Sequence, residues 1–211
     1  ELFLKTGLVL MGASVNVGQI VSVGGRAVVQ ALIGITAVFF FAWYISRLFG
    51  LDRKLRAVIS TSVSICGVSA AIAAAGSVVA KKETLAYVTT LVILFALPLM
   101  ILQPYLAQLL GLSPNVTGAW IGNNIDTTAA VVGAGAIAGD QALKVATIVK
   151  LTQNAFIGVA AFLLALYWVL KVERKPKEKP SPKEIWNRFP KFVLGFAVVS
   201  IVTSIGLLSK P

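Results

Sequence analysis

The longest stretch of the chain without a formal charge covers residues 84–125 and reads TLAYVTTLVILFALPLMILQPYLAQLLGLSPNVTGAWIGNNI. An α-helix rises 1.5 Å per residue and needs roughly 20 apolar residues to cross the hydrocarbon core of a bilayer. These 42 residues are therefore long enough for two crossings. The sequence predicts two membrane-spanning helices here, joined by a short turn.

Similar uncharged blocks occupy most of the remaining chain. Of the 211 residues, 57% are hydrophobic and only 13% are charged, which is too few charges for a surface that faces water. We expect an all-α, polytopic bundle of about seven transmembrane helices that forms a single domain over residues 1–211. The expected helices cover residues 2–20, 27–49, 56–79, 84–110, 114–138, 142–170 and 191–208.

The residue inventory excludes several classes of function. Cys66 is the one cysteine and the chain has no histidine, which excludes an internal disulfide, a Cys/His zinc site and a Ser-His-Asp hydrolase. We expect no enzymatic activity, no metal and no cofactor. The net charge of +11 falls in short loops between apolar blocks, where the positive-inside rule explains it better than a nucleic-acid partner does.

Two connections are strongly basic, residues 47–56 and residues 171–190, and both are predicted to be cytoplasmic. Four predicted spans separate them, which places the turn at residues 111–115 inside and the turn at residues 81–83 outside. The lysine pair Lys81 and Lys82 opposes this assignment. The chain begins at Glu1 rather than at a methionine, and we expect it to be part of a longer protein.

A shift of about 60 residues exposes an internal repeat. Residues 44–51, YISRLFGL, align with residues 105–112, YLAQLLGL, and residues 65–70 then align with residues 125–130. This alignment predicts a duplicated pair of helices in which helices 56–79 and 114–138 are parallel and equivalent.

Each of these two helices carries a polar cluster in the middle of its apolar length. Irregular backbone at membrane depth is tolerated only where protein or a water-filled cavity surrounds it, so both helices are expected to be discontinuous around a shared cavity. Small hydroxyl residues also serve helix packing, so packing and function stay equally open for the first cluster. The residues expected to bind substrate or ion are Ser64, Cys66, Gly67 and Ser69 in the first cluster and Asn123, Asn124, Asp126, Thr127 and Thr128 in the second.

The helix at 142–170 adds Lys150 and Asn154 to this set. Ionisable groups inside a membrane are costly, and they mark functional sites by default. Helix lengths place Asp126 and Lys150 close enough to form a pair. Such a pair either fixes packing only, or leaves Lys150 to receive an anion and Asp126 to exchange a proton or cation.

Four segments together resemble the YeiH-like family of bacterial and archaeal inner-membrane proteins, which are named as sulfate exporters. They are residues 7–12, GLVLMG, residues 50–70, residues 125–132, IDTTAAVV, and residues 145–151, VATIVKL. The resemblance implies a plasma-membrane protein of about ten helices, of which this chain is the central part, distantly grouped with cation/proton antiporters and bile-acid symporters. Many members have a histidine where this chain has Ile125, and shortly after it a glutamine where this chain has Ala129 and Ala130. The resemblance therefore does not imply for this chain a proton relay that depends on that histidine.

The sequence therefore predicts a secondary transporter that moves a small, sulfate-like anion through a site in the middle of the membrane, coupled to H⁺ or Na⁺. One alternative is a cation/proton antiporter, and another is an integral membrane subunit without transport activity. The lipid bilayer is the expected environment, and whether the chain forms a homo-oligomer stays open.

Overall fold

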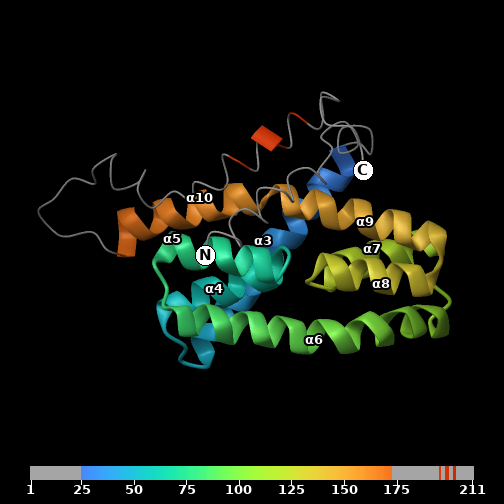
Figure 1. Cartoon of the computed structure of the whole chain (residues 1–211), viewed down its shortest axis with the longest axis horizontal. Coiled ribbons are helices and arrows are strands. Elements are labelled where there is room, and N and C mark those ends of the chain that lie inside the picture. The colour runs from blue at the N-terminus through green and yellow to red at the C-terminus, as the bar shows by residue number, and fades with distance from the viewer. Residues whose placement is uncertain (1–24, 173–194, 196–197, 200–201, 203–211) are drawn as a thin grey trace, which may run out of the picture.

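The computed structural model describes residues 25–172, together with residues 195, 198, 199 and 202. Every regular element of residues 25–172 is helical, which confirms the all-α prediction for this part of the chain (Figure 1). The helix expected at residues 2–20, most of the one at 191–208 and most of the basic loop at 171–190 lie outside the described residues. The elements are α3 (Gly25–Leu48), α4 (Arg53–Ser64), α5 (Val68–Val78), α6 (Lys82–Leu109), α7 (Pro114–Asn124), α8 (Thr128–Ala138), α9 (Asp140–Ala155), α10 (Ile157–Tyr167) and the short π-helix η2 (Trp168–Val172).

Three of these segments are long and apolar enough to cross a membrane: Val28–Leu48, Lys82–Leu109 and Asp140–Val172. They expose large apolar side chains, such as Phe41 on α3 and Phe95 on α6, with 68% and 62% of their surface accessible. Such faces are suited to lipid and not to water. The helices α4, α5, α7 and α8 have only 11 or 12 residues, about 17 Å, or roughly half of the hydrocarbon thickness.

The short helices α4 and α5 form a hairpin that returns to the end from which it entered. The Lys54 ammonium, in the first turn of α4, donates to the Val79 carbonyl oxygen after α5 at 2.9 Å. At the other end of the pair, residues 65–67 make the turn between the two helices. Figure 1 shows α4 and α5 beside each other over one half of the long α6.

The short helices α7 and α8 form a second hairpin. The α7 residues Gly118 and Gly122 lie against Ala142 and Ala146 of α9 in the same order, so α7 runs parallel to α9. The connection between α8 and α9 is the single residue Gly139, and α8 runs back along α9 in the opposite direction. The turn between the two short helices covers residues 125–127, and it points towards the turn of the first hairpin (Figure 1).

The prediction that helices 56–79 and 114–138 are discontinuous is confirmed, but the prediction that each crosses the membrane in one direction is wrong. Each reverses at its polar cluster, where the chain leaves the helical path, and returns to its starting side. Of the five spans expected between residues 27 and 170, three coincide with segments that are long and apolar enough to cross a membrane. Consequently the lysines at 81–82 lie at the same end as residues 47–56, and the turn at 111–115 lies at the opposite end. The conflict between Lys81, Lys82 and the other basic residues therefore disappears.

The order and spacing of the elements support the internal repeat, with its orientation corrected. The first unit is α3 followed by the α4–α5 hairpin, and the second is α6 followed by the α7–α8 hairpin. The 11-residue helices α5 and α8 begin 60 residues apart, at 68 and 128 (128 − 68 = 60). Gly50 and Gly111 end the two long helices with φ of +67° and +63°. Because one crossing helix precedes each hairpin, the hairpins enter from opposite ends, so the units are inverted rather than parallel.

We predict that Arg53→Cys and Lys82→Cys, each in a Cys66→Ala background of the full-length protein, react with a membrane-impermeant maleimide from one and the same side. Asn115→Cys and Asp140→Cys are expected to react only from the other side, because both flank the second hairpin. All four positions are exposed. Labelling in sealed right-side-out and inverted vesicles measures this, and reaction of positions 53 and 82 from opposite sides would contradict the hairpin.

Candidate functional site

The first hairpin turns through residues 65–67, and Ser62 holds this turn on both sides. The Ser62 hydroxyl donates to the Gly67 carbonyl oxygen, and the Gly67 N–H donates to the Ser62 carbonyl oxygen, each at 2.9 Å. Gly67 has φ of +66°, a left-handed conformation that side chains disfavour. A Cβ atom on Gly67 would also lie 2.5 Å from Val92 Cγ1 of α6 and 3.1 Å from Asp126 Cβ. The two hairpin turns are thus in van der Waals contact beside the middle part of α6.

The buried ammonium of Lys150 on α9 completes the first turn. Lys150 is 1% exposed, and its Nζ donates to the Ile65 carbonyl oxygen at 2.7 Å and to Gln153 Oε1 at 3.2 Å. Ile65 is the C-terminal cap of α4, where carbonyl oxygens lack partners inside the helix and the helix dipole is negative. A cation is favoured at this position. Lys150 therefore binds the end of a half-helix rather than a carboxylate.

The second hairpin turns through residues 125–127, and polar side chains hold it as well. The Thr127 hydroxyl accepts from the Ala130 N–H at 3.3 Å and caps α8. The Asn154 amide on α9 donates to the Thr128 hydroxyl at 3.2 Å. On the α7 side, Asn123 Oδ1 accepts from Gln153 Nε2 at 3.0 Å.

A continuous chain of hydrogen bonds thus joins the two turns. It runs from the Ile65 carbonyl through the Lys150 ammonium and the Gln153 amide to Asn123, whose own amide donates to the Ala119 carbonyl at 2.9 Å. Every member satisfies a group that would otherwise be unpaired in a medium of low dielectric. The two hairpins and α9 are therefore fixed relative to one another by polar contacts.

The Asp126 carboxylate lies outside this network. Within the part of the chain that the structure describes, its half-buried carboxylate has no hydrogen bond and no ion pair, although it interacts electrostatically with Lys150. The expected direct pair between Asp126 and Lys150 is not formed among the described residues, where the ammonium donates to the Ile65 carbonyl oxygen and to Gln153 instead. Asp126 lies instead beside Gly67 at the N-terminus of α5, a helix end that no side chain caps.

The structure brings the eleven predicted residues to the two turns and the facing part of α9, although not all in one role. Cys66 belongs to an apolar core cluster with Ile65, Ala70 and Ile157, which fits packing. The Asn124 amide donates to Gln103 Oε1 on α6 at 3.3 Å. The sequence prediction omitted Gln153 and Gln103, which are 2% and 1% exposed. Both residues carry an amide side chain within an otherwise apolar helix, and this feature of the sequence could have identified them as site residues.

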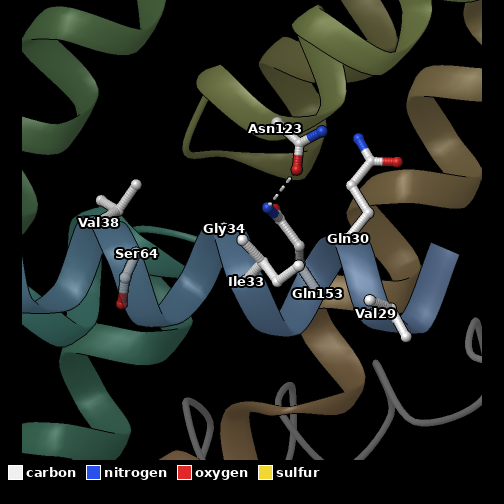
Figure 2. Close-up of a pocket in the computed structure, with 8 residues that line it drawn as sticks. All are labelled: Val29, Gln30, Ile33, Gly34, Val38, Ser64, Asn123 and Gln153. Carbon is white, nitrogen blue, oxygen red and sulfur yellow. Dashed lines mark hydrogen bonds between the residues drawn. The ribbon is translucent and has the colours of Figure 1, made fainter. Parts of the chain in front are cut away.

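A cavity of about 690 Å³ reaches the turns from the side of α3 (Figure 2). Apolar residues of α3 line most of it, and its polar groups are those of Gln30, Ser64, Asn123 and Gln153. Asp126 and Lys150 do not line this cavity, but Gln153 contacts both the cavity and the Lys150 ammonium. Figure 2 shows the Gln153 amide pointing to Asn123 across the space between α9 and α7.

The whole chain, residues 1–211, matches the family described as "Conserved hypothetical protein 698". The chain belongs to this family. It is 44% identical over 208 residues to the UPF0324 membrane protein RB9488 of Rhodopirellula baltica, which covers 97% of this chain and 38% of that protein. A UPF0324 membrane protein of Nitratidesulfovibrio vulgaris is 42% identical over 208 residues, covering 97% of this chain and 36% of that protein.

Both names state a membrane protein and no substrate. The chain spans less than two fifths of the length of each of these two relatives. Family membership supports the prediction of a membrane protein, whereas the sulfate-exporter name suggested by the resemblance is not confirmed. No solved structure matches the chain.

We predict that Gly67→Ala lowers the stability of this family member by about 2 to 4 kcal/mol, because it adds backbone strain and a clash with Val92. Gly76→Ala is the matched control on α5, since nothing lies within 4 Å of its Cβ position and alanine is the better helix former. Unfolding of the full-length protein in mixed micelles measures both. Equal stability of the two variants would contradict the described turn.

Proposed function

We propose that the protein is a secondary transporter, placed in the inner (plasma) membrane with its basic end in the cytoplasm, and that it moves a small oxyanion through the site between the two hairpin turns. The observation that supports this most strongly is the inverted pair of hairpins whose turns meet beside the middle of α6. Inverted repeats with discontinuous helices that meet at the membrane centre are the architecture of many secondary transporters. The orientation follows from the basic residues at 47–56, 81–82 and 171, which share one end.

An anion as substrate is supported by the groups gathered at the turns. The N-termini of α5 and α8 both point to the site, and helix N-termini attract anions. Lys150 adds a full positive charge next to them. The amides of Gln153 and Asn123 provide polar contacts at the cavity. Sulfate is the first candidate because the resemblance to the YeiH-like family suggests it.

Asp126 could couple transport of the anion to transport of a proton. Its carboxylate lies beside the uncapped N-terminus of α5, where it opposes the binding of a second negative charge. Protonation of Asp126 removes this repulsion and leaves the helix end and Lys150 to the anion. Movement of the anion would then require movement of a proton in the same direction.

The main alternative is a cation/proton antiporter, and the unpaired Asp126 carboxylate favours it. In that mechanism Asp126 binds Na⁺ or H⁺, and Lys150 balances the charge when the site is empty. The two mechanisms differ in their substrates. The antiporter exchanges sodium for protons without any anion, whereas the anion carrier does not. A subunit without transport activity would show neither flux.

We predict that the full-length protein in liposomes takes up labelled sulfate faster when a pH gradient is imposed. Lys150→Met is expected to lower uptake at least tenfold, because it removes the charge but keeps the aliphatic stem. Lys144→Met, which changes an exposed lysine on the same helix, is expected to have little effect. Asp126→Asn should leave uptake that no longer responds to the pH gradient, since an amide cannot release a proton.

Absence of sulfate uptake by folded wild-type protein, together with sodium-dependent proton flux, would contradict the anion carrier and support the antiporter. Equal loss of folded protein in the Lys150→Met and Asp126→Asn variants, without any measurable flux in the wild type, would favour a subunit without transport activity.

A further inference from the structure

A second pocket of about 390 Å³ lies at the basic end of the molecule, far along α4 from the hairpin turns. Three separate parts of the chain form it: the end of α3, the start of α4 and the region where α10 continues into η2. Four of its lining residues are cations, namely Arg47, Arg53, Arg56 and Lys171. None of the acidic residues that the structure describes lines it.

The nearest acidic residue in sequence, Asp52, is already engaged. Its carboxylate accepts from the backbone N–H groups of Lys54 and Leu55 at 2.7 Å and 3.2 Å and caps the N-terminus of α4. The described part of the chain therefore supplies no carboxylate to neutralise these four charges. A bound anion would neutralise these charges.

Two polar N–H groups of the pocket residues have no acceptor among the described residues. Trp168 is 1% exposed, and its indole Nε1–H is buried without a hydrogen bond. The Arg56 Nε–H is also buried and unpaired, although the same guanidinium donates from Nη2 to the Leu51 carbonyl oxygen at 2.8 Å and lies 5.3 Å from the Trp43 ring centroid. Buried donors are nearly always paired in native proteins, so unpaired donors here point to an absent acceptor.

The chemistry and the position of the pocket specify the ligand. Guanidinium groups bind phosphate through pairs of parallel hydrogen bonds, and Trp is enriched at the level of the lipid headgroups. Basic pockets between transmembrane helices bind anionic headgroups on the cytoplasmic side. We propose that this pocket binds a phosphate group at the membrane surface, carried by an anionic phospholipid such as phosphatidylglycerol or supplied as free phosphate. The bound phosphate ties the ends of α3, α4 and α10 together.

The test uses the full-length protein in nanodiscs of phosphatidylcholine, alone or mixed with phosphatidylglycerol, and a third sample of phosphatidylcholine nanodiscs with added inorganic phosphate. Arg53→Gln combined with Lys171→Gln removes two exposed charges from the pocket. Lys81→Gln combined with Lys82→Gln is the matched control, because it removes two exposed charges at the same end without changing the pocket. The thermal unfolding midpoint and native mass spectrometry of bound lipid are the readouts.

Phosphatidylglycerol is expected to raise the unfolding midpoint of the wild type and of the control, while the pocket variant binds the lipid about tenfold more weakly or worse. A rise with inorganic phosphate alone, lost in the pocket variant, would assign the site to free phosphate. The proposal is overturned if neither ligand shifts the wild type, or if the pocket variant and the control lose the lipid effect equally. The last result would mean that the lipid responds only to the overall charge of this end.

Discussion

The structure depends on one hydrogen bond from a buried ammonium to the end of a half-helix. A hairpin that stops in the middle of a membrane leaves carbonyl groups without partners, and each costs several kcal/mol in hydrocarbon. Lys150 satisfies the Ile65 carbonyl with a charge of the sign that a helix C-terminus favours. The contact gives the carbonyl oxygen a donor and gives the buried ammonium an acceptor of negative partial charge. It explains why so costly a residue lies on an apolar helix.

Further hydrogen bonds connect Lys150 to the second hairpin. Gln153 accepts from Lys150 and donates to Asn123, so one side chain of α9 connects both turns. The duplication is consistent with the geometry: two units of one long helix and one hairpin, related by inversion, bring in their hairpins from opposite ends, and the two turns meet between them. Asp126 lies at the junction beside Gly67, and its carboxylate has no hydrogen bond to any described residue.

Much of this arrangement could be predicted from the sequence. Hydropathy gave the helices, and the polar runs around Cys66 and Asp126 gave the positions of the two breaks. Hydropathy could not predict the direction of the chain after each break. A second half-helix that continues across the membrane and one that turns back have the same apolar length. The charge pattern held a clue, since Lys81 and Lys82 agree with the positive-inside rule only if the first hairpin returns. The pairing of Lys150 was missed because its partner is a backbone carbonyl, which no residue type reveals.

The most direct test of the account is a double-mutant cycle between Lys150→Met on α9 and Asn123→Ala on α7, measured as the free energy of unfolding of the full-length protein in mixed micelles. If the two residues belong to one network through Gln153, the combined effect departs from the sum of the single effects by about 0.5 to 3 kcal/mol. Additivity within about 0.3 kcal/mol would show that the hairpins are held independently, and it would contradict a shared polar centre.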